Sequence, residues 1–260
     1  FSSLTGYAAD PVVTLVVALL IIIGGIGFLT WEDIRSSRFH FQKYRMQTKV
    51  ILSATGILIL IPALYFFFFE FADFPVNERL LLSFFQSVTP RTAGFNTADL
   101  TAMSEAGQSL IIILMLIGSS PGSTAGGMKT TTIAILFANT IAVFRRRESP
   151  HFFKRRIAFE TVSRACTILI MYTILFLTGG FIISRIEGIT VIESLFETAS
   201  AIGTVGLSLG VTPELGVVSR FILIGLMFFG RVGGLTLIYA TLSNIHNPGS
   251  RFPEERITVG

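Results

Sequence analysis

Two tripeptides, Thr92-Ala93-Gly94 and Thr204-Val205-Gly206, combine residue types that can point backbone carbonyl oxygens at a cation. Glycine permits backbone conformations that a Cβ would block, and threonine adds a hydroxyl oxygen beside it. A dehydrated cation inside a membrane needs oxygen ligands, and backbone carbonyls outside a helix provide them. A single Thr-x-Gly sequence is equally compatible with a turn or a small-residue packing motif. Two copies in matching contexts favour a cation pore.

The glycine-rich stretch SPGSTAGGMKTTT, residues 120–132, contains the residue types of a phosphate-binding loop. That loop requires the pattern G-x-x-x-x-G-K-[ST] between a strand and a helix. Here Met128 separates Gly127 from Lys129, and an uncharged apolar run precedes the glycines. We therefore expect the glycines to interrupt a membrane helix, and we predict neither a nucleotide site in this chain nor an enzyme.

The composition indicates an all-α integral membrane protein, because 51% of the residues are hydrophobic and only 14% are charged. The mean hydropathy is +0.71, whereas soluble domains contain about 25% charged residues. An apolar run of about 20 residues crosses the hydrocarbon core as a helix, which satisfies its own backbone. Four uncharged runs have this character: Val12–Trp31, Val50–Phe69, Ala106–Met128 and Ala165–Ser184.

The charged residues lie between these runs and predict the orientation in a cell membrane. Basic loops stay in the cytoplasm, so the basic clusters should face inward and the acidic connections outward. The inward clusters are Arg35–Lys49, Arg145–Arg164 and the tail with Arg251 and Arg256; the outward acids are Glu70, Asp73, Asp99, Glu105, Glu187 and Glu193. We therefore interpret the net charge of +4 as a signal of membrane orientation, with some contact to lipid or a partner, and we predict no binding to nucleic acid.

An internal repeat connects the two tripeptides to the apolar runs. Each Thr-x-Gly sequence ends a short stretch, Ser83–Thr97 or Ser194–Gly210, that is too short to span a membrane. Each stretch follows a full spanning run and precedes an apolar helix containing a double glycine. The double glycines are Gly24-Gly25, Gly126-Gly127 and Gly233-Gly234. We expect repeated units of helix, pore loop and broken helix. The unit at the start of this chain should be incomplete, because its N-terminal portion is missing.

Five motifs in order carry a resemblance to a known family: SVTPRTAGFNTADL, SPGSTAGGMKTTT, ETASAIGTVGLSLG, GRVGGLTL and the ending PEERITVG. Together they resemble the Trk/Ktr/HKT potassium transporters, and among these the bacterial Ktr-type membrane subunits. The resemblance implies helix–pore loop–helix (M1-P-M2) units around one ion pathway. Residues 1–47 would end the second unit, 48–157 would form the third, 158–247 the fourth, and 248–260 a cytoplasmic tail.

The resemblance also implies the residues of a selectivity filter and a gate. Potassium would bind the filter carbonyls of Thr92, Ala93, Gly94 and Phe95 in the third unit and Thr204, Val205, Gly206 and Leu207 in the fourth. The gate would be the loop 119–127, with Lys129 and Arg231. The residues of that loop are Ser119, Ser120, Pro121, Gly122, Ser123, Thr124, Ala125, Gly126 and Gly127.

Three charged residues near these motifs have more than one interpretation. Arg231, within the last apolar run, should either bond to carbonyls freed by the break at Ser119–Gly127 or extend toward the membrane surface. Lys129 should either extend to the cytoplasmic side or bind the loop. Arg91 should either hold the first Thr-x-Gly loop, through carbonyls or an acid such as Glu197, or be an extracellular surface charge.

The implied function is potassium uptake across a bacterial cell membrane. A homodimer would be gated by a cytoplasmic ring of Ktr A-type regulatory subunits, and ATP or ADP would bind that ring. No cofactor is expected in this chain, and His40, His151 and His246 are too scattered for a transition-metal site. The alternative is a secondary transporter of another cation or solute, a class that also uses broken helices.

Overall fold

A computed structural model describes residues 3–38 and 40–233, which are mostly helical. The part of the expected fourth unit at residues 234–247 and the expected tail 248–260 lie outside the described residues. The helices are α1 Pro11–Ile26, α2 Phe28–Ser36, α3 Met46–Tyr65 with a π-helical turn Phe66–Glu70, α4 Val76–Val88, α5 Glu105–Leu116, α6 Thr130–Phe144, α7 Phe159–Glu187, α8 Val191–Ile202 and α9 Val217–Val232. Short 3₁₀ helices cover Thr5–Tyr7, Phe41–Lys43 and Thr212–Glu214.

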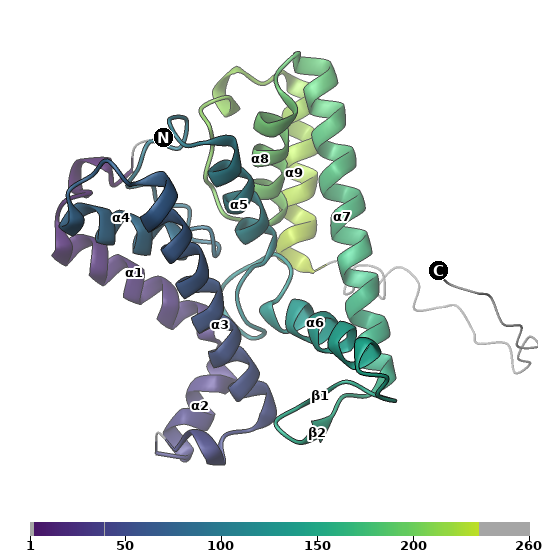
Figure 1. The fold of residues 1–260 in the computed structure, drawn as a ribbon. Coiled ribbons are helices and arrows are strands. Elements are labelled where there is room, and N and C mark those ends of the chain that lie inside the picture. The colour runs from purple at the N-terminus through teal and green to yellow at the C-terminus, as the bar shows by residue number, and fades with distance from the viewer. Residues whose placement is uncertain (1–2, 39, 234–260) are drawn as a thin grey trace, which may run out of the picture.

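One small hairpin interrupts the helical architecture. Strand β1, His151–Phe152, pairs antiparallel with β2, Arg155–Arg156. The hairpin lies between α6 and α7, near the ends at which α3 and α7 begin (Figure 1).

Two helices in the described part of the chain are long and apolar enough to cross a membrane, Met46–Glu70 and Phe159–Glu187. At 1.5 Å per residue, each exceeds a hydrocarbon core of about 30 Å. Helices α1 and α2 would form a third span if counted together, although they meet at an angle of 89°. Large apolar side chains such as Leu60, Phe181 and Phe221 are exposed on the helix surfaces, as expected for residues that face lipid.

The same order of elements occurs twice. Helix α3 is followed by the short α4, a Thr-x-Gly loop and α5; helix α7 is followed by the short α8, a second Thr-x-Gly loop and α9. Helix α4 packs against α3, and α8 packs against α7 (Figure 1). Helices α4 and α8 have 13 and 12 residues, so each is shorter than a membrane span. Helix α8 begins with a capping box formed by Thr190 and Glu193.

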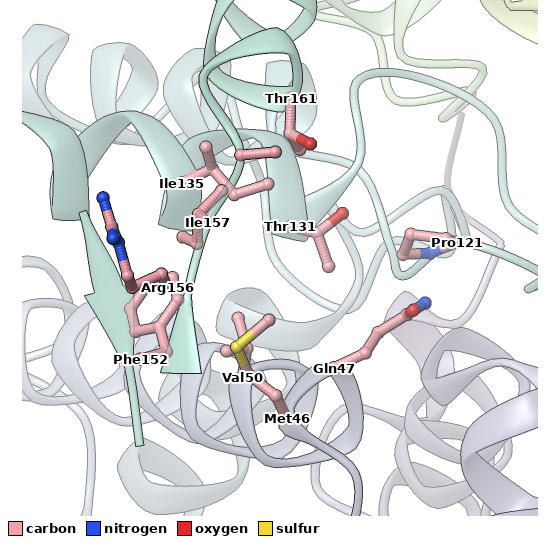
Figure 2. A pocket seen from close by; sticks show the side chains of 11 residues that line it. Met46, Gln47, Val50, Pro121, Thr131, Ile135, Phe152, Arg156, Ile157 and Thr161 are labelled. Atoms are coloured by element: carbon pink, nitrogen blue, oxygen red, sulfur yellow. The ribbon is translucent and has the colours of Figure 1, made fainter. Parts of the chain in front are cut away.

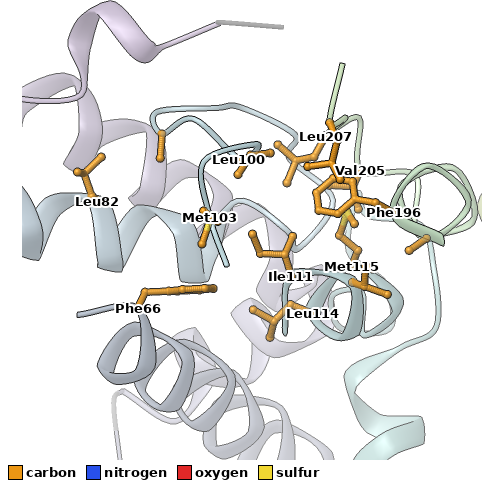
Figure 3. Close-up of a cluster of buried hydrophobic side chains, with 14 of the residues drawn as sticks. Phe66, Leu82, Leu100, Met103, Ile111, Leu114, Met115, Phe196, Val205 and Leu207 are labelled. Atoms are coloured by element: carbon orange, nitrogen blue, oxygen red, sulfur yellow. The ribbon is translucent and has the colours of Figure 1, made fainter. Parts of the chain in front are cut away.

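The main hydrophobic core holds the second Thr-x-Gly loop in place. Side chains from α5, α8 and the connection before α5 pack around Val205 and Leu207, and the core continues from there to α4 and the turn after α3 (Figure 3). The buried members include Phe66, Leu82, Leu100, Met103, Ile111, Leu114, Met115 and Phe196. Burial of these two loop side chains leaves the backbone of the loop as the part that can meet a ligand.

The first helix break differs from the expectation. Helix α1 continues through Gly24 and Gly25 to Ile26, and the chain turns at Gly27, which has a φ of 93°. Gly25 instead provides room for Ser119, since a Cβ on Gly25 would lie 2.9 Å from the Ser119 hydroxyl. The double glycine is therefore a packing surface, and the single glycine after it is the break.

The apolar run 106–128 is not one helix. Helix α5 ends at Leu116, and α6 begins at Thr130, so the interruption spans the whole stretch between them. Ile117 and Met128 form one bridge of parallel β type across the base of this loop. The predicted break therefore exists and extends beyond Gly126-Gly127.

Candidate functional site

The first Thr-x-Gly loop turns its backbone donors toward the end of α4. The N–H groups of Ala93 and Gly94 donate to the carbonyl of Thr89, at 3.2 and 3.3 Å. The Thr89 hydroxyl donates to the carbonyl of Phe95 at 2.6 Å. Within the described part of the chain, the carbonyls of Thr92, Ala93 and Gly94 accept no hydrogen bond. These three oxygens are the ones that remain available to a cation.

The second loop repeats this arrangement at the end of α8. The N–H of Val205 donates to the Ser200 carbonyl at 2.8 Å, and the N–H of Gly206 donates to the Ser200 hydroxyl at 3.0 Å. The N–H of Thr204 donates to the Ala201 carbonyl at 3.0 Å. Both loops thus use their donors locally, which leaves acceptors for a positively charged ligand.

The two threonines share an uncommon backbone conformation. Thr92 has a φ of 66° and Thr204 a φ of 52°, and among the described residues no other β-branched residue has a positive φ. This conformation costs a β-branched residue on the order of 1–3 kcal/mol, and such strain clusters at functional sites. Gly94 and Gly206 follow with φ values of 74° and 97°. The same strained geometry at both loops marks them as a candidate site.

The two loops meet directly. A Cβ on Gly94 would overlap the carbonyl oxygen of Val205 and would lie 3.2 Å from the Cα of Gly206. Beside this contact is a cavity of about 70 Å³. It is lined by Gly94, Gly206 and their neighbours Ser3, Asn96, Leu100, Leu207 and Ser208. The cavity can hold a water molecule or a small ion.

A second, larger cavity touches the first loop and the α5–α6 interruption. Its volume is about 330 Å³, and Thr92, Ala93 and Phe95 form part of its wall. Gly24 and Gly25 of α1 and the loop residues Ser119, Thr124 and Ala125 complete much of the rest. The first loop therefore separates a small cavity from a large one, and residues 119–127 border the large one.

Residues 119–127 connect two helix breaks with the end of α9. The N–H of Ser120 donates to the Gly25 carbonyl at 3.0 Å, and the Gly122 carbonyl accepts from the N–H of Phe28 at 3.1 Å. At the other end, the N–H of Gly127 donates to the Gly230 carbonyl at 3.0 Å. The break after α1, the break after α5 and the end of α9 thus lie at one place in the fold.

The same segment contacts both Thr-x-Gly loops. The Ser119 hydroxyl donates to the carbonyl of Arg91 at 3.3 Å, immediately before the first tripeptide. A Cβ on Gly126 would overlap the Thr204 side chain, and a Cβ on Gly127 would lie 3.3 Å from the Cα of Gly203. The segment is therefore close enough to both loops to affect a ligand between them.

Arg231 and Lys129 both bind carbonyls of this segment. Arg231 donates from Nη1 to the carbonyl of Thr124 at 2.6 Å, which confirms the expected bond to a carbonyl freed by the break. Lys129 donates from Nζ to the carbonyl of Ala125 at 2.6 Å and to that of Gly126 at 3.5 Å. Of the two alternatives for Lys129, the structure has the one in which its side chain binds the loop.

Arg91 is not a surface charge and does not pair with Glu197. Its side chain is 4% exposed and donates from Nη2 to the Thr55 hydroxyl of α3 at 3.3 Å. Glu197 instead accepts hydrogen bonds from the hydroxyls of Ser208 and Thr212, which fixes the segment after the second tripeptide. Arg91 follows α4 and Glu197 lies within α8, and each has other hydrogen-bond partners, so the proposed contact between them was wrong.

Sequence reasoning missed two single glycines that allow close backbone approach. A Cβ on Gly203 would overlap the Met115 carbonyl, and a Cβ on Gly230 would overlap the Ile202 carbonyl. Isolated glycines in apolar helical runs are the signal that could have identified them. Gly203 lets α5 approach the end of α8, and Gly230 lets α9 approach it, immediately before the second tripeptide.

The sequence and the fold have known relatives. A family model described as TrkH, cation transport protein, matches residues 2–249. The chain is 34% identical over 264 residues to the Ktr system potassium uptake protein B of Bacillus subtilis, covering 99% of this chain and 59% of that protein. It is 38% identical over 258 residues to the potassium/sodium uptake protein NtpJ of Enterococcus hirae, covering 95% and 57%.

A solved structure has a similar fold. The potassium transporter TrkH from Vibrio parahaemolyticus matches with a TM-score of 0.71 and 19% identity, covering 87% of this chain and 51% of that one. The chain therefore spans less than two thirds of the length of these relatives.

Proposed function

The chain belongs to the TrkH family of cation transport proteins, and on that premise we propose that it forms part of a potassium uptake pathway in a bacterial cell membrane. Potassium is the transported ion, and it passes the Thr-x-Gly loops of two consecutive M1-P-M2 units. Helices α3 and α7 are the first helices of these units, α4 and α8 are the pore helices, and α5 and α9 begin the broken ones.

The observation that carries this proposal is the matched pair of loops with unused carbonyls. Residues 92–94 and 204–206 have the same alternation of backbone handedness. Five of their six N–H groups, all but that of Thr92, donate to residues at the end of the preceding helix. The C-terminal ends of α4 and α8 precede the loops, so their partial negative charge favours a cation there. Phe95 and Leu207 complete the proposed filter, although the Phe95 carbonyl is bonded to Thr89 in this conformation.

Residues 119–127 are proposed as the gate of this pathway. They border the large cavity next to the first loop and bond to α1, α9 and Arg91. Arg231 adds a positive charge at the same place, which raises the barrier for a cation. Opening requires the segment to leave this position, and the hydrogen bonds that Arg231 and Lys129 donate to its carbonyls must then break or move with it.

The resemblance to Ktr-type subunits supports the proposed partners. A homodimer would bind a cytoplasmic ring of nucleotide-binding regulatory subunits, and ATP or ADP on that ring would change the position of the gate. Helix α6 follows the gate directly, and the basic hairpin follows α6, so this region offers a route from the cytoplasm to the gate.

Reconstitution into liposomes tests the function. The full-length protein should take up potassium or rubidium down an imposed gradient, with competition by sodium measured in parallel. Arg91→Lys and Thr92→Ala variants should change the ratio of potassium to sodium uptake, because they alter the loop or its attachment to α3. Uptake that depends on an organic solute, or an ion ratio unchanged by both variants, would refute the proposal.

A further inference from the structure

A cavity of about 380 Å³ opens where three helices and the hairpin meet (Figure 2). Its wall includes the first turns of α3, α6 and α7 and both strands of the hairpin. The lining is mainly apolar, from Met46, Val50, Ile135, Phe152 and Ile157. None of the filter or gate functions described above uses this cavity.

The two ends of the cavity differ chemically. Arg156 lies at the hairpin end, and Pro121 of the 119–127 segment lies at the opposite end (Figure 2). Arg156 donates from Nε to the Ser149 hydroxyl at 2.9 Å. In the described part of the chain its two Nη nitrogens make no hydrogen bond or ion pair. They are therefore available to an anion, and arginine matches the geometry of a phosphate group.

The surroundings of Arg156 are strongly basic. Lys154 and Arg155 belong to the same hairpin, and Arg145 and Arg147 precede it. A neighbouring cavity of about 300 Å³ shares Phe152 with the first and is also lined by Phe137, Ile141, Arg145 and Arg147. The nearby acids are Glu148, Glu160 and Asp33. Glu160 is paired with Arg164, and the Asp33 carboxylate accepts from the N–H of Arg45 at 2.8 Å. The positive charge at this end is thus largely uncompensated.

The three helix starts add to the positive potential. Helices α3, α6 and α7 each begin without a side-chain cap at their N-cap residues Arg45, Lys129 and Ala158. Uncapped helix N-termini carry a partial positive charge. At α6 the N–H of Thr130 is already bonded to the Ser119 carbonyl at 3.2 Å, so this helix start contributes through its dipole. Apolar walls, a free guanidinium and positive helix starts together describe a ligand with an acyl chain and an anionic headgroup.

We propose that this cavity binds an anionic phospholipid, with its phosphate at Arg156 and an acyl chain between Val50, Ile135 and Ile157. The proposal rests on the membrane location in the proposed function, because α3 and α7 begin their apolar spans at this cavity. Basic pockets between membrane helices on the cytoplasmic side are typical sites for such headgroups. A free phosphate ion would leave the apolar wall unused.

The position of the site suggests regulation of the gate by the lipid. Pro121 belongs to the 119–127 segment, and Thr131 lies in the first turn of α6 directly after it; both line the cavity. A bound acyl chain therefore touches the segment that must move for the pathway to open. The bound lipid would stabilise the position of residues 119–127 in which Pro121 still lines the cavity.

Binding of a fluorescent phosphatidylglycerol to the purified full-length protein in detergent tests the site. Arg156→Gln should weaken binding roughly tenfold, because a charge-assisted hydrogen bond to the phosphate is lost. The matched control is Arg155→Gln, which removes the same charge from a residue that does not line the cavity, and it should leave binding within about twofold. Val50→Trp should abolish binding by filling the acyl region, and Ile135→Phe is the second filling variant if Val50→Trp does not fold.

Three outcomes would overturn the proposal. They are equal losses in Arg155→Gln and Arg156→Gln, equal binding of fluorescent phosphatidylcholine, and full competition by glycerol phosphate or inorganic phosphate, which would reveal a plain anion site. Because the readout is binding, it remains valid even if the protein does not transport potassium. Uptake into liposomes with and without phosphatidylglycerol then measures the effect on the gate separately.

Discussion

At the residue scale, the tripeptides differ in why they need glycine. Gly94 has a positive φ and also faces the Val205 carbonyl of the other loop, so both conformation and space exclude a side chain. Gly206 has a positive φ but open space where a Cβ would lie. The two positions look equivalent in the sequence, yet a side chain at Gly94 would enter the contact between the loops and a side chain at Gly206 would not.

Alanine substitution should separate these two roles. Gly206→Ala should weaken potassium uptake about fivefold, because a positive φ costs an alanine roughly 1–2 kcal/mol. Gly94→Ala should reduce uptake further and lower the preference for potassium over sodium, since its Cβ would displace the second loop. The measurement is the concentration dependence of potassium and sodium uptake in liposomes.

Gly225 provides a matched control, because it lies within α9 and has open space and no positive φ. Gly225→Ala should behave as the unsubstituted protein. A Gly94→Ala variant with the uptake and ion preference of Gly225→Ala would remove the first loop from the proposed filter.

A second prediction at this scale concerns the bond from Arg231 to Thr124. Arg231→Gln should raise potassium uptake without the regulatory subunit roughly tenfold, because a charge-assisted hydrogen bond that holds the segment is lost. Arg220→Gln removes a charge from the opposite end of α9, where Arg220 bonds to the Pro213 carbonyl, and should have no such effect. Lower uptake in Arg231→Gln than in Arg220→Gln would contradict a closing role.

At the element scale, two helix breaks and the end of α9 act as one unit. The turn at Gly27, the stretch between α5 and α6, and the end of α9 are connected by backbone bonds from Ser120, Gly122 and Gly127. A movement of the 119–127 segment must break these bonds together. A segment held by a few backbone hydrogen bonds opens locally more readily than a packed helix does, as a segment with two positions requires.

Shortening this segment tests its role. Deletion of Gly122 and Ser123 should raise uptake in the absence of the regulatory subunit, because the segment could no longer reach both α1 and α9. The expected increase is at least as large as that of Arg231→Gln. A deletion of the same size in the exposed connection before α4, at Ala72 and Asp73, serves as the control and should leave uptake unchanged. Equal uptake in both deletions would argue against the gate.

At the scale of the whole molecule, the basic hairpin and the acidic connections lie at opposite ends of the long helices. Helix α7 begins next to the hairpin and ends at Glu187, which accepts hydrogen bonds from the N–H of Gly216 and the Ser219 hydroxyl. The charge asymmetry therefore coincides with the direction of the spans. This supports a cytoplasmic hairpin and an external side that holds the entrance to the Thr-x-Gly loops.

Single cysteines test this orientation, in a background in which Cys166 and any further cysteine of the full-length protein are replaced by serine. Ala102→Cys, in the connection before α5, should react with a membrane-impermeant maleimide in intact cells. Glu148→Cys, before the hairpin, should react only after the cells are permeabilised. Both positions are exposed, so access depends on the side of the membrane. The reverse labelling pattern would invert the assigned topology and place the proposed lipid site outside the cell.

The sequence by itself determined the class of the protein, the two Thr-x-Gly loops and the stretch in which α5 is interrupted. These features depend on local properties: apolar length, charge between the runs, and glycine where the backbone must leave a helix. It also indicated that Arg231 bonds to the interrupted stretch, since a charge in an apolar run needs polar partners.

Only the tertiary structure decided which groups meet. Gly24 and Gly25 were expected to break α1, yet packing against Ser119 fills that position and moves the turn to Gly27. The partner of Arg91 is Thr55 on α3, and the contact of Gly94 with Val205 joins two distant loops. Residues far apart in the chain come together through packing of whole helices, and no local pattern in the sequence records that distance.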